Sequence, residues 1–124
     1  MTLESDVRVM SGTGDTGLIF RATNLGTSAD AMNGYYVGIR DSTDQLLLGR
    51  MNGTWSEITT ASVPIQSGVN YRMKVVAAGP DIRVYIDDMA IPKLHVHDAT
   101  WSAGAVGVRA HFASAAFDNL SITR

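Results

Sequence analysis

Two carboxylates near the N-terminus have a spacing that could support chemistry. Glu4 and Asp6 lie within residues 3–9, where apolar and polar side chains alternate. This period of two predicts a half-buried strand with both carboxylates on one face. Such a pair could flank a sugar, but a glycosidase of this kind needs a further Glu as general acid, and that position is Val9. A solvated carboxylate pair or a ligand contact is therefore favoured over catalysis.

A pair of histidines has the same spacing near the C-terminal end. His95 and His97 are two residues apart, which could place two imidazoles on one metal ion. Asp98 is the only further ligand that the sequence suggests. A solvated strand face is the favoured interpretation of this pair, and the isolated His111 is expected to be a packed or surface residue.

Several classes of function are disfavoured by what the chain contains. It has no cysteine, and it has no Gly-x-Ser-x-Gly motif, so thiol and serine nucleophiles of the usual kinds are excluded. The glycines at positions 12, 14 and 17 match a dinucleotide-binding pattern, but they join two predicted strands and no helix follows. The net charge of −2 provides no field that would gather nucleic acid or an anionic membrane surface.

Aromatic and planar polar side chains suggest a recognition surface instead. Aromatic rings stack on the C–H faces of sugars, and guanidinium or carboxylate groups match neighbouring hydroxyls. Core packing is the alternative for each aromatic residue. For Arg21 and Arg109, which end apolar runs, the alternative is a structural ion pair with Glu4 or Asp6. The candidate groups are Tyr35, Tyr36, Trp55 and Trp101, with Arg21, Arg40, Arg109, Glu4 and Asp6.

The elements that would position these groups are all strands. Short apolar runs separated by Gly, Asn, Ser and Asp fill the chain, and no segment has apolar residues at helical spacing over three turns. Residues 11–15 are expected to be a hairpin turn between strands 3–9 and 17–23, and residues 24–34 a long loop. Further hairpins are predicted around Asn52-Gly53 and residues 78–81. The sequence thus predicts one all-β domain over residues 1–124, a sandwich or barrel of about ten strands.

Seven short motifs, in order along nearly the whole chain, resemble the concanavalin-like jelly-roll modules attached to bacterial glycoside hydrolases. The levan- and fructoside-binding carbohydrate-binding modules and the laminin-G-like domains are the most similar groups. The motifs are GLIFRATN at 17–24, NGYYVGI at 33–39, LGR at 48–50 with Gly53-x-Trp55, YRMKV at 71–75, IRVYID at 82–87, GAVGVR at 104–109 and AFDNL at 116–120.

The resemblance implies an antiparallel two-sheet β-sandwich without catalytic activity. Its role would be to bind a polysaccharide, such as a fructan, levan or related glycan, and so hold a linked glycoside hydrolase on it outside the cell. The alternative is a structural or protein-interaction β-sandwich that binds no sugar. The expected ligand-binding residues are Glu4, Asp6, Arg21, Tyr35, Tyr36, Trp55 and Arg109.

Two further expectations come from the resemblance. Asp118, in the Phe-Asp-Asn motif, is expected near a structural calcium ion. Related modules also have a stretch rich in Gly and Trp upstream of the Glu4-x-Asp6 strand, and here the chain begins at that strand without a leader-like segment. We therefore expect a piece of a larger secreted protein that lacks an N-terminal stretch, with an uncovered edge strand through which two copies could associate.

Overall fold

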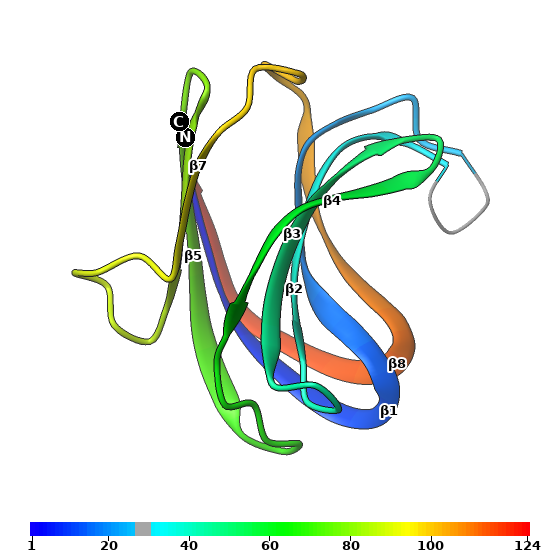
Figure 1. Cartoon of the computed structure of the whole chain (residues 1–124), viewed down its shortest axis with the longest axis vertical. Coiled ribbons are helices and arrows are strands. Elements are labelled where there is room, and N and C mark those ends of the chain that lie inside the picture. The colour runs from blue at the N-terminus through cyan, green and yellow to red at the C-terminus, as the bar shows by residue number, and fades with distance from the viewer. Residues whose placement is uncertain (27–30) are drawn as a thin grey trace.

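The computed structural model describes residues 1–26 and 31–124, and within them every regular element is a β-strand (Figure 1). Accordingly, no helix that could cross a membrane is found in the described part of the chain. The strands are β1 (Thr2–Thr23), β2 (Asn33–Arg40), β3 (Gln45–Asn52), β4 (Trp55–Ser62), β5 (Asn70–Ala78), β6 (Asp81–Ile86), β7 (Leu94–His97) and β8 (Ala105–Thr123).

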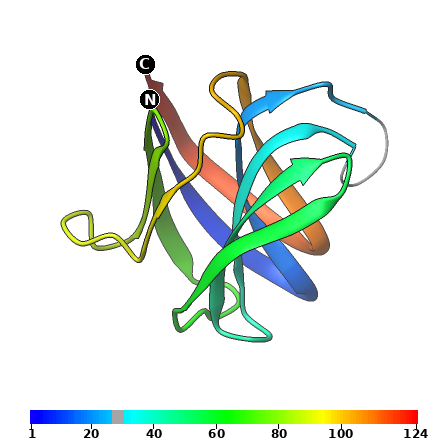
Figure 2. The ribbon, with the colours of Figure 1, turned by 45° about the horizontal axis from the view of Figure 1, so that its top comes forward.

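Two long strands, β1 and β8, run through both layers of the molecule. They pair antiparallel from Thr2 opposite Thr123 to Ala22 opposite Ala105. The first part of β1 also pairs with β5, and its last part pairs with β2. One layer therefore has the order β8-β1-β5-β6-β7 and the other β8-β1-β2-β3-β4. Figures 1 and 2 show the curved β1–β8 ribbon joining the layers, with the chain termini side by side, which confirms the predicted two-sheet β-sandwich.

The bend in this ribbon corrects the prediction of a hairpin turn at residues 11–15. The chain stays extended there, and the β1–β8 register shifts between Val9 and Ser11 and again between Gly12 and Asp15. Gly12 has a φ of 104°, and a Cβ on it would lie 2.5 Å from the carbonyl oxygen of Phe112. The glycines therefore let two backbones approach closely in a bend instead of closing a turn. The partner of this bent strand is likewise one continuous strand, β8.

The two other predicted hairpins are confirmed. Strands β3 and β4 are joined at Asn52-Gly53, where Gly53 has a φ of 74°. Strands β5 and β6 are joined through Gly79, with a φ of 57°. Both turns need backbone in the left-handed region, which glycine adopts without strain. Residues 27–30 of the predicted long loop lie outside the described residues.

Apolar residues pack in two places. The main core lies between the layers and includes Leu3 and Val75 from one layer and Phe20 and Leu46 from the other. A smaller cluster covers the opposite face of the β1-β2-β3-β4 layer. Strands β1 and β2 are therefore buried on both faces in this layer, which explains why residues 17–20 are apolar without alternation. The smaller cluster consists of Ala22, Met32, Tyr36, Leu47 and Met51.

Candidate functional site

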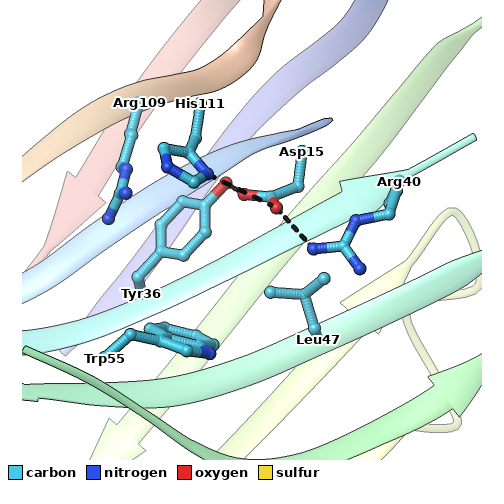
Figure 3. Close-up of a pocket in the computed structure, with 7 residues that line it drawn as sticks. All are labelled: Asp15, Tyr36, Arg40, Leu47, Trp55, Arg109 and His111. Carbon is cyan, nitrogen blue, oxygen red and sulfur yellow. Dashed lines mark hydrogen bonds and ion pairs between the residues drawn. The ribbon is translucent and has the colours of Figure 1, made fainter. Parts of the chain in front are cut away.

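A pocket of about 200 Å³ opens on the outer face of the β1-β2-β3-β4 layer (Figure 3). Side chains that alternate with the core positions form it, so the same strands that build the core also position the site. Strands β1, β2, β3, β4 and β8 all contribute. The lining residues are Asp15, Tyr36, Arg40, Leu47, Trp55, Arg109 and His111.

The ring of Tyr36 is the centre of this pocket. It lies along the sheet over Gly38, where a Cβ would be only 2.5 Å from the phenol oxygen. The hydroxyl donates a hydrogen bond of 2.6 Å to Oδ1 of Asp15. Burial, and then the neighbouring Asp15 carboxylate, raise the pKa of Tyr36 well above its ordinary value. The phenol therefore stays neutral and serves as a fixed hydrogen-bond donor and apolar surface.

Asp15 connects the two sides of the pocket. Its Oδ2 accepts a hydrogen bond of 2.8 Å from Arg40, and its side chain is 5% exposed against 32% for Arg40. The imidazole Nδ1 of His111 lies 4.0 Å from the same oxygen. Figure 3 shows the three side chains converging on this carboxylate. Because the buried Asp15 accepts hydrogen bonds from both Tyr36 and Arg40, it holds these two side chains in place.

Trp55 forms an aromatic wall beside Tyr36. The two ring centroids are 5.9 Å apart at an interplanar angle of 69°, an edge-to-face arrangement. The far edge of the indole lies over Gly49, where a Cβ would overlap with ring atoms. Glycine at this position gives the indole room to lie against the sheet. The half-buried Trp55 therefore offers ring surface at the pocket.

Arg109 borders the pocket from β8. Its guanidinium carbon lies 4.9 Å from the centroid of the Tyr36 ring, a cation–π contact. Its Nη1 also lies 3.3 Å from the sulfur of Met51. A guanidinium has five N–H donors in a fixed plane. Arg40 and Arg109 therefore place two planar cationic groups at one pocket.

The pocket contains part of the predicted site. Tyr36, Trp55 and Arg109, three of the residues predicted to bind a ligand, lie together at this pocket. Asp15 and His111 were not predicted, because they face one another across the β1–β8 bend, where a turn was expected. No signal in the sequence marks Asp15, because residues 11–15 show no alternation of apolar and polar side chains.

Glu4 and Asp6 do not line this pocket, and their partner is not Arg21 or Arg109. Arg72 of β5 lies between them, with Nη2 at 3.1 Å from Glu4 and Nη1 at 3.2 Å from Asp6. A hydrogen bond from Asn119, and further contacts with Arg72, lower the pKa of Asp6. The carboxylate pair is therefore part of a polar network that joins β1 to β5 and β8.

Arg21 of β1 and Tyr35 of β2 also lie outside the pocket, and both contact the loop before β8. Arg21 is 8% exposed with a φ of 53°, and its Nη1 donates to the carbonyls of Gly79 and Trp101 at 2.8 and 3.1 Å. Tyr35 is fully buried in the core, and its hydroxyl donates a 2.6 Å hydrogen bond to Asp98. Both side chains fasten the loop before β8 to the sandwich. The left-handed backbone that turns Arg21 toward these loops has no marker in the sequence.

Asp118 lies where β8 crosses the start of β1, in register with Asp6. Its Oδ1 accepts the backbone N–H of Asn119 at 2.7 Å, and the Asn119 side chain donates to Oδ2 of Asp6 at 2.7 Å. Calcium takes six to eight oxygen ligands. Here Asn119 donates to both carboxylates and Arg72 also pairs with Asp6, so these residues do not fit the expected calcium ion.

Known proteins share both the sequence and this fold. Residues 1–123 match the family described as 3-keto-alpha-glucoside-1,2-lyase-like domain. The chain is 30% identical over 123 residues to a levanase of Bacillus subtilis (strain 168), and 26% identical over 125 residues to a levanase of Bacillus sp. (strain L7). These alignments cover 97% and 99% of this chain but only 17% and 13% of the levanases.

Solved structures give the same result. The carbohydrate binding module CBM66 from Bacillus subtilis is similar with a TM-score of 0.84 and 30% identity, over 96% of this chain and 71% of that one. Sheep galectin-11, solved in complex with glycerol, has a TM-score of 0.69 at 10% identity, over 97% and 86% of the two chains, which shows a shared fold. The resemblance seen in the sequence is thus confirmed, and the chain belongs to the family of 3-keto-alpha-glucoside-1,2-lyase-like domains.

Proposed function

We propose that this chain is a non-catalytic carbohydrate-binding module and that the Tyr36 pocket is its sugar site. The observation that carries the proposal is the combination of an aromatic wall, Trp55 against Tyr36, with two guanidinium groups at one pocket. Sugars are bound by this combination of ring stacking and planar donors. The similarity to CBM66 supports the same function.

The proposed ligand is a fructan such as levan, or a related glycan. The levanases and CBM66 support this class. A pocket of about 200 Å³ is smaller than most sites for drug-sized ligands, so it suits a single sugar ring. A shallow site of this kind predicts a Kd of roughly 10 μM to 1 mM, about −4 to −7 kcal/mol.

The module would serve a larger enzyme. The chain spans 17% and 13% of the two levanases, so we propose that it is linked to a glycoside hydrolase and holds that enzyme on its polymer. Binding a shared polymer raises the effective concentration of substrate at the linked catalytic domain. Since polysaccharides do not cross membranes, the proposed location is extracellular. Detection of the parent protein in the medium of its native cells would support that location, and its retention inside washed cells would contradict it.

Isothermal titration against levan, inulin, arabinan and xylan tests the sugar site. We expect heat with a fructan, and a loss of at least tenfold in affinity for Trp55→Ala and Arg109→Ala, about 1.4 kcal/mol or more. Arg8→Ala, an exposed arginine on β1 outside the pocket, is the matched control and should bind as the wild type does. If the wild-type chain gives no heat of binding with any of the four polymers, the proposal is rejected in favour of a structural β-sandwich. Turnover of a sugar substrate that requires the pocket residues would instead show an enzyme.

We also propose that two copies associate through β8. Among the described residues β8 pairs only with β1, so its other edge has no strand neighbour. Val108, Phe112 and Leu120 on β8 are 43%, 79% and 51% exposed. Antiparallel pairing of one edge with its own copy is a two-fold arrangement that satisfies both edges. Light scattering should find dimers that Phe112→Lys with Leu120→Lys abolishes, and a wild type that is monomeric at every concentration would disprove the association.

A further inference from the structure

Three metal-ligating side chains meet on the outer face of the other layer, at its β7 edge. Asp81 begins β6, and His95 and His97 lie on β7, with Asp81 directly opposite His97 in the antiparallel register. On β7, Leu94 is buried while both histidines are exposed, so the imidazoles point away from the core. The pairing of β6 with β7 thus adds a carboxylate to the histidine pair, in place of the neighbouring Asp98.

The three side chains converge on one point. The Nε2 atom of His95 lies 2.5 Å from Oδ1 of Asp81, and the Nε2 atom of His97 lies 3.1 Å from the same oxygen. The two ring centroids are 5.4 Å apart. All three potential ligand atoms lie within 4.8 Å of one another. Both imidazoles therefore present the same nitrogen to the same carboxylate oxygen.

We propose that this cluster binds one divalent transition-metal ion, with Zn²⁺ as the reference ion. The ligands would be Oδ1 of Asp81 and Nε2 of His95 and His97, with water in the remaining position. Two imidazoles with one carboxylate suit Zn²⁺, Ni²⁺ or Cu²⁺, whereas Ca²⁺ and Mg²⁺ prefer oxygen ligands. At a tetrahedral zinc the ligand atoms are about 3.3 Å apart, given bonds of about 2.0–2.2 Å. The two nitrogens now lie 2.5 and 3.1 Å from the carboxylate oxygen, and rotation of the exposed side chains would bring these distances to that spacing.

The surroundings hold the carboxylate in place and leave the site accessible. Nε of Arg83 donates a 3.0 Å hydrogen bond to Oδ2 of Asp81, the oxygen that the proposed ion does not use. Such a partner orients a ligating carboxylate, although its positive charge also limits affinity. The side chains of Asp81, His95 and His97 are 25%, 41% and 71% exposed, so an ion can enter directly from solvent.

A bound ion would fasten the short edge strand β7 to β6. The segment that follows β7 begins with Asp98, whose backbone N–H bonds the carbonyl of Pro80 at 2.8 Å. Asp98 also accepts hydrogen bonds from Tyr35 and Arg50, so it is already occupied and is not available as a metal ligand. The ion would therefore stabilise the β6–β7 edge, independently of the sugar pocket.

Titration of the chelator-treated chain with ZnCl₂ at pH 7.5, followed by calorimetry, tests this site. We expect one ion per chain, with affinity reduced roughly tenfold or more in His95→Ala, His97→Ala and Asp81→Asn. The third histidine gives the matched control, because His111→Ala should bind Zn²⁺ as the wild type does. Circular dichroism checks that each variant is folded, and Ca²⁺ in place of Zn²⁺ should give no saturable heat.

A second measurement does not depend on any variant. In the wild-type chain, Zn²⁺ should shift the imidazole nitrogen resonances of two histidines and leave the third in place. Absence of saturable Zn²⁺ binding below about 1 mM, which is about −4 kcal/mol, would overturn the proposal. So would equal binding by the folded His95→Ala/His97→Ala double variant. Levan binding should be the same with and without Zn²⁺, so the two sites can fail separately.

Discussion

Tyr36 lies over Gly38, two residues further along the same strand, so closely that a Cβ at position 38 would be 2.5 Å from the phenol oxygen. Residues two apart on a strand share a face, and the absence of a side chain at one lets the other lie flat. The same relationship recurs between Trp55 and Gly49 on neighbouring strands. The aromatic surface of the pocket therefore depends on these two glycines, which leave room for the rings to lie against the sheet.

Gly38→Ala should weaken sugar binding without unfolding the domain. The added methyl group forces the Tyr36 ring away from the sheet, which breaks its 2.6 Å hydrogen bond to Asp15. We expect a loss of about tenfold in affinity by calorimetry. Gly107→Ala is the control on the same layer, since its Cβ would lie at an ordinary 3.5 Å from Ile19. Equal affinities for the two variants would show that the ring position does not matter.

Alkaline pH should destabilise the chain through Tyr36. Because the pKa of this phenol is raised above its usual value of 10.0, the folded state keeps the proton after the unfolded state has lost it. The folded state then binds more protons, so the free energy of unfolding falls as pH rises above about 10. Below that pH the contribution is complete. Urea unfolding between pH 9 and 11 measures the fall, and Tyr36→Phe should make the curve shallower.

Tyr36→Phe should itself cost stability at neutral pH. It leaves one oxygen of the buried Asp15 without its donor, which costs about 1–3 kcal/mol. A variant whose unfolding midpoint and alkaline profile both match the wild type would contradict this account of the pair.

Acid pH should destabilise the folded chain through Asp98. Burial works against its charge, but hydrogen bonds from Tyr35 and Thr100 outweigh burial, and the pKa of Asp98 is lowered from 3.8. Its contribution to stability is complete above about pH 4 and is lost as pH falls through the lower folded value. Urea midpoints at pH 5 and pH 2.5 measure this loss. Tyr35→Phe removes one of the donors and should reduce the difference between the two midpoints, whereas an unchanged difference would assign the acid sensitivity to other groups.

Glu4→Gln and Asp6→Asn should leave sugar binding unchanged. Both carboxylates are held by Arg72, and neither lines the pocket. Solvent screens these partly exposed ion pairs, so each change should have only a small effect on stability. Calorimetry and urea unfolding of the two variants check both statements. Loss of affinity in either variant, with the fold intact, would place the sugar on the β1–β5 face instead.

Much of the fold could be predicted because alternating apolar residues and turn residues are visible in short stretches of the sequence. Alternation in residues 71–77 and the Asn52-Gly53 pair specify hairpins directly. The bend at residues 11–15 could not be predicted, since glycines that allow close backbone approach look the same as glycines that close a turn. The sequence therefore predicts about ten strands, whereas the described residues form eight. The predicted two-sheet architecture is confirmed.

The site was only partly predictable for a related reason. Tyr36, Trp55 and Arg109 could be proposed from their types, because aromatic and guanidinium groups carry recognition chemistry. Asp15 could not, because its importance comes from facing His111 across the β1–β8 pair, about ninety-six positions away in the chain. Arg21 lies outside the pocket, with a positive φ and a hydrogen bond from its side chain to the carbonyl of Gly79. Alternation gives the face of a residue only where the backbone is regular.

The antiparallel pairing of β1 with β8 also determines when the domain can finish folding during its synthesis. Residues 2–23 leave the ribosome long before residues 105–123, so the opening strand must wait for almost the entire domain to be synthesised before its longest neighbour exists. Contacts of such large sequence separation make folding slow, on the order of milliseconds to seconds. Until then an apolar edge stays open to other nascent chains. Stalled or prematurely terminated translation near residue 100 should consequently yield aggregates rather than a smaller working domain.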